Sequence, residues 1–533
     1  MNTIKGNMLF NRAPTSDPEA SFYEPLLCEH DRNIILPSPP TSHEKYLYVK
    51  SGRWLISIFG LVSSSCLMTG MWLFIVATGT YWFSVFAAVS TVYLYISYLM
   101  VNCVGKDFNL RVHRNIQKLN SNSCPAVDIL LPVCGEDFEV IYNTWTYVSA
   151  LDWPTKSVYV LDDKKDPKVR DLAQRFGFTY ITRENNHMKK AGNLRNAFTK
   201  TTAPFFAIFD ADFCPRPDYL KEIMPYFAHD GKIAIVQTPQ FFEVRPDQTW
   251  VERAAGSVQE LFYRFIQVSR DTFGGAVCVG TCAVYRREAL VPFGGTAEIG
   301  FSEDVHTGFS VVDDGWKLKY VPLNLAKGVC PYELKSFFSQ QYRWALGSTT
   351  LCANPHFWKS NLSFRQKACF LSGMLYFQVT AFATVLATVP GIIMLMWFPE
   401  HVLWFNATFA LPSLIFGWIL MPVWSAQDYP FTVNHLKVAQ SYSHLFAIKD
   451  KLMGTMMLWE STGGAGAATS SANRFLQGRI LCGLTTAFSL VFTYGMTFYY
   501  VHHGFALVNF LPGLFLTALN TLTNLPFIIN RQD

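Results

Sequence analysis

Four long stretches of this chain contain no charged side chain, and they constrain its fold more than any other feature. Residues 54–105, 368–399, 401–427 and 480–530 hold no Asp, Glu, Lys or Arg. A helix needs about 20 mostly apolar residues to cross the hydrocarbon core of a bilayer. The first and last stretches are each long enough for two crossings, with breaks at 78–80 and 502–504. We therefore predict a polytopic α-helical membrane protein with about six transmembrane helices, at 54–77, 81–103, 373–397, 402–424, 480–500 and 505–529, and an amphipathic surface segment at 364–372.

Basic residues gather on one side of the predicted spans. The turns at 78–80, 398–401 and 502–504 contain no Lys or Arg, whereas the opposite side is rich in both. Positive charge marks the cytosolic side of a membrane protein, so we predict that both termini and the segment 104–367 are cytosolic. The polar segment 1–43 has no apolar core after a basic start, which predicts a disordered cytosolic tail and no signal peptide.

The overall composition argues against several classes of protein. Half of the 533 residues are hydrophobic, which excludes disorder of the whole chain. The net charge of +5 is small for this length and gives no argument for a nucleic acid partner. The twelve cysteines form no repeated Cys-x-x-Cys pairs, so neither a disulfide scaffold nor a zinc ribbon is expected.

The segment between the second and third predicted spans has a different pattern. Helical stretches at 169–176, 190–199 and 218–227 alternate with short β-rich runs, at 127–133, 157–161, 179–182, 205–209, 233–237 and 319–321. This alternation predicts an α/β domain with a mostly parallel sheet covered by helices. Ligands of such sheets bind beyond the carboxyl ends of the strands.

Acidic pairs follow two of the predicted strands. Asp162 and Asp163 come after one strand, and Asp210 and Asp212 after another. Two carboxylates at such an end can ligate Mg²⁺ or Mn²⁺, which often share their ligands with a substrate diphosphate. The alternative is that these residues only cap turns, and it becomes weaker when two pairs occur in one domain.

Two further motifs stand nearer the returning membrane spans. Glu303 and Asp304 follow a glycine-rich approach, and they could also belong to an ordinary helix start. Arg343 and Trp344, three and four residues after Gln340, offer a diphosphate clamp and a flat apolar face. An Arg beside a Trp is also common at membrane interfaces.

Taken together and in order, these motifs resemble those of the processive, membrane-integrated family 2 glycosyltransferases, whose members make cellulose and related β-glucans, mannans, chitin and hyaluronan. The resemblance covers roughly residues 54–529. The stretches 190–197, 209–212, 236–242, 259–263, 280–290 and 343–347 look most like the cellulose synthase branch. Tyr342 departs from the form typical of chitin synthases, and Ser302 stands where Thr is usual.

The resemblance implies a cytosolic α/β nucleotide-diphospho-sugar transferase domain of the GT-A kind. It implies a UDP-sugar donor, with UDP-glucose favoured, bound by Asp162, Asp163, Asp210, Asp212 and Arg343. Asp210 and Asp212 would hold Mg²⁺ or Mn²⁺, and Asp304 would be the catalytic general base of an inverting transfer. Gln340 and Trp344 would lie at the acceptor site and channel entrance. Lys190 and Arg195 could add donor contacts or be surface charges.

A membrane channel would carry the growing polysaccharide, because sugar hydroxyls lose their hydrogen-bond partners in hydrocarbon. Candidate lining residues in the predicted spans are Tyr93, Tyr95, Tyr98, Tyr376, Gln378, Trp404, Trp424 and Asn520. The segment 446–451 resembles the gating loop of bacterial cellulose synthase, which would give Phe446, Ile448 and Lys451 a gating role. Lys449 stands where that loop has Thr, and an interfacial amphipathic segment is the alternative.

The predicted organisation is a tail at 1–50, spans at 51–104, a transferase domain at 105–360, spans at 361–427, a gating segment at 428–479 and spans at 480–530. The expected product is a β-linked polysaccharide, most simply a β-glucan. Alternatives are a hyaluronan- or chitin-type synthase, a non-processive transferase to a lipid acceptor, and a transporter or receptor with a soluble domain. We expect the plasma membrane, with the Golgi as the alternative and room for accessory subunits.

Overall fold

The computed structural model describes residues 36–119, 124–456 and 469–531. Contacts divide the chain into Met1–Leu36 and Pro37–Asp533, and every element below belongs to the second unit. The helices, with η for 3-10 and π segments, are η3 (Glu44–Tyr46), α1 (Arg53–Thr78), η4 (Tyr81–Phe83), α2 (Ser84–Tyr95), η5 (Ile96–Asn102), α3 (Leu110–Leu119), α4 (Phe138–Ser149), α5 (Pro167–Arg175), α6 (Lys189–Lys200), α7 (Tyr219–His229), α8 (Trp250–Leu261), η6 (Phe262–Ile266), α9 (Gln267–Asp271), α10 (Arg287–Leu290), η7 (Val291–Phe293), α11 (Glu303–Asp313), α12 (Leu334–Cys352), α13 (Pro355–Lys359), α14 (Phe364–Leu386), α15 (Val389–Trp397), η8 (Pro399–His401), η9 (Trp404–Phe409), α16 (Leu411–Ile415), η10 (Phe416–Leu420), α17 (Met421–Trp424), α18 (Val433–Met453), α19 (Thr469–His502), η11 (Leu507–Asn509) and α20 (Leu511–Ile529).

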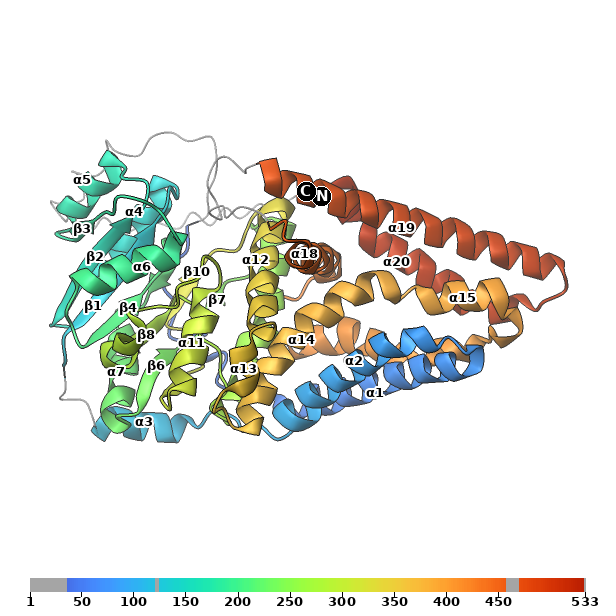
Figure 1. Ribbon diagram of the computed structural model, residues 1–533, viewed down its shortest axis with the longest axis horizontal. Coiled ribbons are helices and arrows are strands. Elements are labelled where there is room, and N and C mark those ends of the chain that lie inside the picture. Colours follow the sequence, from blue (N-terminus) through green and yellow to red (C-terminus); the bar gives the residue numbers. More distant parts are fainter. Residues whose placement is uncertain (1–35, 120–123, 457–468, 532–533) are drawn as a thin grey trace, which may run out of the picture. The chain divides into compact units, whose positions relative to one another are not determined.

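A seven-stranded sheet organises the domain between α3 and α12 (Figure 1). Its order is β3-β2-β1-β4-β8-β6-β9, with β1 (Val127–Val133), β2 (Lys156–Asp162), β3 (Thr179–Ile181), β4 (Phe205–Ile208), β6 (Ile233–Gln237), β8 (Ala283–Arg286) and β9 (Lys317–Tyr320). The pairs are parallel except that β8 runs antiparallel to both β4 and β6. The predicted α/β fold is therefore confirmed, and β8 is a strand that the sequence pattern missed.

The parallel strands bring the predicted acidic motifs to one edge of the sheet. β1 lies between β2 and β4 and is parallel to both. The carboxyl ends of these three strands therefore point the same way, and the segments after them converge. A second sheet of order β5-β10-β7 stands beside them, with β5 (Cys214–Pro215), β7 (Phe241–Phe242) and β10 (Ala326–Gly328).

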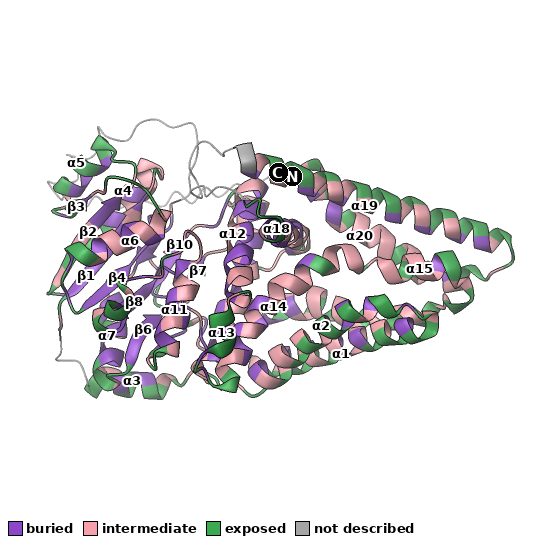
Figure 2. Cartoon of the chain, in the orientation of Figure 1, coloured by how far each residue is buried: buried purple, intermediate pink, exposed green. Residues whose placement is uncertain are grey.

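Burial on both faces explains why the central strands are apolar throughout. All residues of β4 and β6 are buried, and helices cover the sheet (Figure 2). Parallel sheets with two covered faces favour such continuous apolar runs over alternating ones. Trp145 on α4 and Phe206 on β4 are at most 1% exposed. Each such side chain stabilises the fold by about 2–3 kcal/mol through burial of apolar surface.

Five helical segments of the described residues are long and apolar enough to cross a membrane. They are Arg53–Thr78, Tyr81–Asn102, Phe364–Trp397, Ser471–His502 and Leu511–Ile529. The span predicted at 402–424 differs, because only the shorter helix Leu411–Trp424 is apolar and helical there. A 3-10 segment occupies Trp404–Phe409, and Pro412 stands in the first turn of the next helix, where proline is tolerated.

The segment predicted to lie on the membrane surface at 364–372 is instead the first part of α14. Ser363 and Gln366 form a capping box that starts this helix, and the helix then continues without a break to Leu386. A capping box satisfies backbone donors at a helix start. The amphipathic piece and the span that follows it are therefore one element.

Helices α12 and α18 connect the sheet domain to the apolar helices. α18 packs against both α12 and α14. The predicted gating residues Phe446, Ile448 and Lys451 lie on α18, so the expectation of a loop at 446–451 is wrong. The helix ends only at Met453, where Gly454 adopts a φ of 69° that favours glycine. Residues 457–468 of the predicted gating segment lie outside the described residues.

Candidate active site

Asp162, the last residue of β2, and Asp163, which follows it, are held by donors of their own domain. Oδ1 of Asp162 accepts from the N–H of Lys164 at 2.7 Å, and its Oδ2 accepts from the Tyr180 hydroxyl at 2.8 Å. Arg183 binds both carboxylate oxygens of Asp163, at 2.6 and 2.7 Å. These bonds fix the loop after β2, and the predicted contact of the pair with a donor nucleotide stays a prediction.

Asp210 and Asp212 follow β4 at the same edge of the sheet. The Asp210 N–H donates to the Thr281 hydroxyl at 2.9 Å, which ties this turn to the segment before β8. Burial and the charge of Asp210 raise the pKa of Asp212 to about 7. Two neighbouring carboxylates favour a cation between them, and oxygen ligands suit a hard divalent ion. The pair therefore fits the predicted Mg²⁺ or Mn²⁺, although the described residues contain no cluster of three or more His, Cys, Asp or Glu side chains arranged around a metal position.

Glu136, three residues after β1, is an acidic group of this site that the sequence analysis missed. Burial raises the pKa of Glu136, and the charges of Asp210 and Asp162 add to the effect. Its Oε2 accepts from the N–H of Cys134 at 2.6 Å. The sequence did offer a signal for Glu136, because it follows an apolar strand, as the two aspartate pairs do.

Lys190 supplies the positive charge of the site. Its Nζ donates to Oδ1 of Asp210 at 2.5 Å and to the carbonyl of Gly280 at 3.1 Å. Burial alone would lower the pKa of Lys190, but the charges of Asp210, Glu303 and Asp304 and the hydrogen bond to Asp210 together outweigh it, and the pKa is raised. Arg195, the other basic candidate, instead donates to the backbone carbonyls of Phe293 and Thr296, which is a structural role.

Asp304 stands in the first turn of α11, next to Gly280. Burial, with the charge of Glu303, raises the pKa of Asp304 to about 7. A Cβ atom on Gly280 would lie 2.9 Å from Oδ2 of Asp304, and the φ of Gly280 is 78°. Only glycine fits this position without strain, because any Cβ atom would crowd the carboxylate of Asp304.

Some side chains of residues 340–344 on α12 line a cavity, whereas others point into the domain interior. Trp344 and Gln341 line a cavity of about 490 Å³, whereas the predicted Gln340 is not among its lining residues. Arg343 donates to the Ser339 hydroxyl at 3.2 Å. Tyr342 points the other way and donates to Oδ2 of the fully buried Asp450 on α18, at 3.0 Å.

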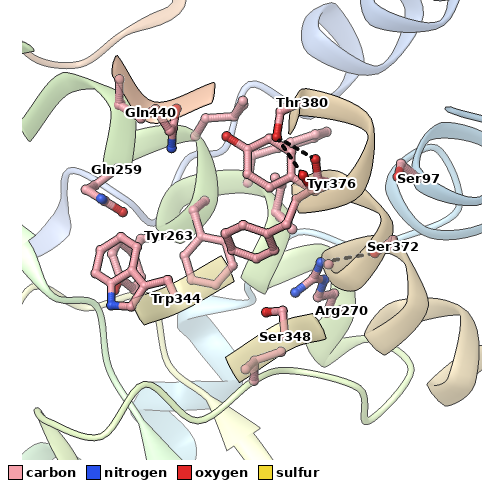
Figure 3. Close-up of a pocket in the computed structure, with 18 of the residues that line it drawn as sticks. Ser97, Gln259, Tyr263, Arg270, Trp344, Ser348, Ser372, Tyr376, Thr380 and Gln440 are labelled. Carbon is pink, nitrogen blue, oxygen red and sulfur yellow. Dashed lines mark hydrogen bonds between the residues drawn. The ribbon is translucent and has the colours of Figure 1, made fainter. Parts of the chain in front are cut away.

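This cavity joins the sheet domain to the apolar helices. Asp304 and Trp344 line it together with Tyr98 on η5, Tyr376 on α14 and Phe416 on η10. Figure 3 shows Trp344 and Tyr263 on one side and Arg270 with Ser372 on the other. Of the eight candidate channel residues, Tyr93, Tyr98 and Tyr376 line it. Lys451 lines a different cavity, of about 420 Å³, together with His306.

Comparison with known proteins shows similarity to glycosyltransferases. Residues 128–291 match the family model "Glycosyl transferase family 2". The cellulose synthase catalytic subunit (UDP-forming) of Pseudomonas fluorescens (strain SBW25) is 34% identical over 268 residues, which are 49% of this chain and 36% of that protein. The corresponding subunit of Xanthomonas axonopodis pv. citri (strain 306) is 34% identical over 263 residues, 48% of this chain and 36% of that protein. The matched regions thus span about a third of these relatives.

Solved structures resemble the chain more distantly. The mannosyltransferase PcManGT from Pyrobaculum calidifontis, in complex with GDP-Man and Mn²⁺, has a TM-score of 0.46 at 15% identity, covering 68% of this chain and 98% of that one. S. aureus TarS 1–349 has a TM-score of 0.34 at 11% identity, covering 63% of this chain and 95% of that one.

Residues 128–291 of the chain therefore form a domain that matches the family 2 glycosyltransferases. Over about half of its length the chain is similar to cellulose synthase catalytic subunits, the branch whose motifs it resembles.

Proposed function

We propose that this protein polymerises a β-linked polysaccharide from a UDP-sugar and passes the product across the membrane. One observation carries the proposal: Asp304 and Trp344 line the same cavity as residues from α1, η5, α14 and η10. An enzyme that transfers one sugar to a soluble acceptor needs no cavity that leads from its base into membrane helices. A polymer that leaves through the membrane does need one, because its hydroxyls require polar contacts along the way.

The mechanism assigns each side chain a task. Asp304 takes the proton from the acceptor hydroxyl as that oxygen attacks the anomeric carbon of the donor, in one inverting displacement. Trp344 supports the terminal sugar of the acceptor by stacking. Lys190, already charged beside Asp210, lies where it can offset negative charge on the donor diphosphate. Asp210 and Asp212 would hold Mg²⁺ or Mn²⁺, which neutralises charge developing on the leaving nucleotide.

The donor is proposed to be UDP-glucose and the product a β-glucan. Two relatives at 34% identity are named as UDP-forming catalytic subunits of cellulose synthase. The absence of Lys and Arg from the turns at 78–80, 398–401 and 502–504 favours a cytosolic transferase domain, which would meet UDP-sugars there. The plasma membrane is the natural site for an enzyme that exports such a polymer.

The test is an assay of the purified protein in detergent with UDP-glucose, UDP-GlcNAc, UDP-glucuronate and GDP-mannose, each with Mn²⁺ or Mg²⁺. Nucleotide release and product size are measured for the wild type, for Asp304→Asn and for Asp314→Asn. Asp314 is an exposed aspartate at the other end of α11 and serves as the matched control.

Metal-dependent release with UDP-glucose and a high-molecular-weight product, lost only in Asp304→Asn, would support the proposal. Release and polymer with another donor instead would show that the product is a different polysaccharide. A small or lipid-linked product would favour a non-processive transferase. Folded protein that releases no nucleotide from any donor would contradict the proposal.

A further inference from the structure

Residues 37–48 are folded onto the sheet domain, although the sequence analysis assigned them to a tail. They precede the first apolar helix, α1, and we call them the N-terminal strap. Pro37 and Lys45 of the strap are buried. The Tyr48 ring, 1% exposed, packs edge-on against Phe241 of β7, with 5.6 Å between the ring centroids. A segment with such buried side chains is part of the folded domain, because burial offsets the conformational entropy that a tail would keep.

The strap contacts the chain directly after Asp212. Cys214, two residues further on, is fully buried and donates from its thiol to the carbonyl of Pro37 at 3.4 Å. Arg216 donates from its guanidinium to the carbonyl of Pro40. Alternate residues of an extended segment point to the same side, so the strap lies along one side of the segment that leaves Asp212.

Lys45 joins the strap to the start of α7. Its Nζ pairs with Oδ2 of Asp218 at 2.7 Å and also with Glu222, one turn further along α7. Lys45 is only 5% exposed, so it needs these carboxylates to offset the loss of hydration of its charge. Asp218 also binds Arg216, which ties this ion pair back to the segment after Asp212.

Glu44 makes a second ionic link, to the small sheet. Its Oε1 pairs with Nζ of Lys327 on β10 at 2.8 Å, and Lys327 is 2% exposed. Glu243 also pairs with Lys327, at 3.2 Å. Lys327 lies opposite Cys214 in the antiparallel pair of β10 and β5. The strap therefore supports β5 and also the strand beside it.

The turn that carries the two aspartates needs support at its far end. The Phe213 N–H donates to the carbonyl of Asp210 at 3.1 Å, which closes this turn around Asp212. The strand that follows, β5, is only two residues long, and its second residue, Pro215, has no N–H to donate. The strand pairing alone therefore holds the end of the turn weakly, and the bonds from the strap add to it.

We propose that the N-terminal strap positions Asp210 and Asp212 for the divalent cation, with Glu44 and Lys45 as its positioning residues. The inference rests on the metal role that the proposed function gives to the two aspartates. Glu44 and Lys45 act through the turn and not on the cation itself. Carboxylates bind a cation best when neighbouring contacts fix their positions. Loss of the strap contacts therefore weakens cation binding, and it leaves the chemical step intact once the cation is bound.

The test uses the whole chain in detergent, with Mn²⁺ as the probe. The rise of Tm with Mn²⁺ gives the concentration for half-maximal effect in the absence of any sugar donor. The Mn²⁺ dependence of nucleotide release is the second readout. The variants are Glu44→Gln, Lys45→Met and Lys45→Arg.

Arg287→Met is the matched control. Arg287 pairs with the buried Asp128 at 3.2 Å. Asp128 is the second residue of β1, so this ion pair lies at the opposite end of the strand from the edge that carries the aspartate turn. The control thus removes a buried ion pair of the same domain without touching the strap.

We expect Glu44→Gln and Lys45→Met each to raise the half-maximal Mn²⁺ concentration about fivefold, since partners bonded directly to metal ligands change affinity by about 10–100-fold and the strap acts one step further away. The kcat at saturating Mn²⁺ should stay within about twofold of wild type. Lys45→Arg should respond to Mn²⁺ nearly as wild type does, because a guanidinium can engage both carboxylates. Arg287→Met should lower Tm without metal but leave the half-maximal Mn²⁺ concentration unchanged.

Folded strap variants with the Mn²⁺ response of wild type would overturn the inference. An equal loss of Mn²⁺ affinity in Arg287→Met would also overturn it, because the effect would then be one of general stability, and so would a wild type whose Tm does not respond to Mn²⁺. The proposed function fails by a different result. A wild type that binds Mn²⁺ in a strap-dependent way but makes no polymer would refute the proposed function and leave the role of the strap standing.

Discussion

The protonation of Asp304 should control how the rate of glycosyl transfer depends on pH. A general base works only when it has lost its proton, and the pKa of Asp304 is raised to about 7 by burial and by the charge of Glu303. The rate should therefore rise with pH through this value. With that pKa, the ionised fraction of Asp304 grows about tenfold between pH 6 and pH 8. An aspartate with its ordinary pKa would give almost no change over this range.

Replacement of Glu303, the acidic neighbour of Asp304, should shift the pKa of Asp304 in a known direction. Glu303→Gln removes a negative charge that raises the pKa of Asp304. The pKa should then fall, and the rate should reach its plateau at lower pH. The shift has a fixed sign, which distinguishes it from a general loss of activity.

The assay is nucleotide release measured from pH 5.5 to pH 9 at saturating donor and metal. Saturating metal matters because the pKa of Asp212 is also raised to about 7, and a bound cation would keep Asp212 ionised across the range. The remaining pH dependence then reports on Asp304. A rate that stays flat between pH 6 and pH 8, or a Glu303→Gln profile that moves to higher pH, would refute the reasoning.

Three further changes test separate parts of the molecule. Asp212→Asn should raise Tm at pH 8 without metal. A carboxyl group whose pKa is higher in the folded than in the unfolded protein destabilises the fold as pH rises from about 4 through 7, here by up to about 4 kcal/mol. Mn²⁺ should raise the Tm of the wild type more than that of the variant, and equal responses would contradict a metal site there. Gly280→Ala should lower kcat about 100-fold with the fold intact, because the added Cβ would lie 2.9 Å from Oδ2 of Asp304 and would push this carboxylate aside. A near-normal kcat would count against Asp304 as the general base. Asp450→Ala should destabilise the protein by about 3 kcal/mol in thermal unfolding, since it removes a fully buried carboxylate that both Tyr342 and the partly exposed Arg474 bind. Lys449→Ala, whose side chain is 40% exposed, should change stability by less than about 1 kcal/mol.

Residues close in sequence could be placed correctly without the structure. Asp210 and Asp212 follow an apolar strand and stand near each other whatever the rest of the chain does. Glu136 obeys the same rule after β1, but a single acid after one strand is a weaker pattern than a pair. The helical state of 446–451 was also open to prediction, because no Gly or Pro interrupts the segment between Val433 and Gly454. The resemblance to a gating loop outweighed that local signal.

Features that depend on long-range packing could not be obtained in this way. The close approach of Gly280 and Asp304 joins residues on two elements, and no local pattern connects them. The engagement of Asp163 by Arg183 and of Asp210 by Lys190 decides which carboxylates are already paired. A sequence gives the charge of each side chain, whereas its partner depends on how the elements meet.

The sequence by itself determined the membrane-spanning character, the α/β domain and the order of the acidic motifs. These follow from local properties, namely the length of charge-free stretches, the alternation of strand and helix patterns, and the residues after each strand. Only the tertiary structure decided that Asp304 and Trp344 share a cavity with residues of the apolar helices. A cavity is bounded by side chains from helices far apart in sequence, so it exists only once those helices have packed.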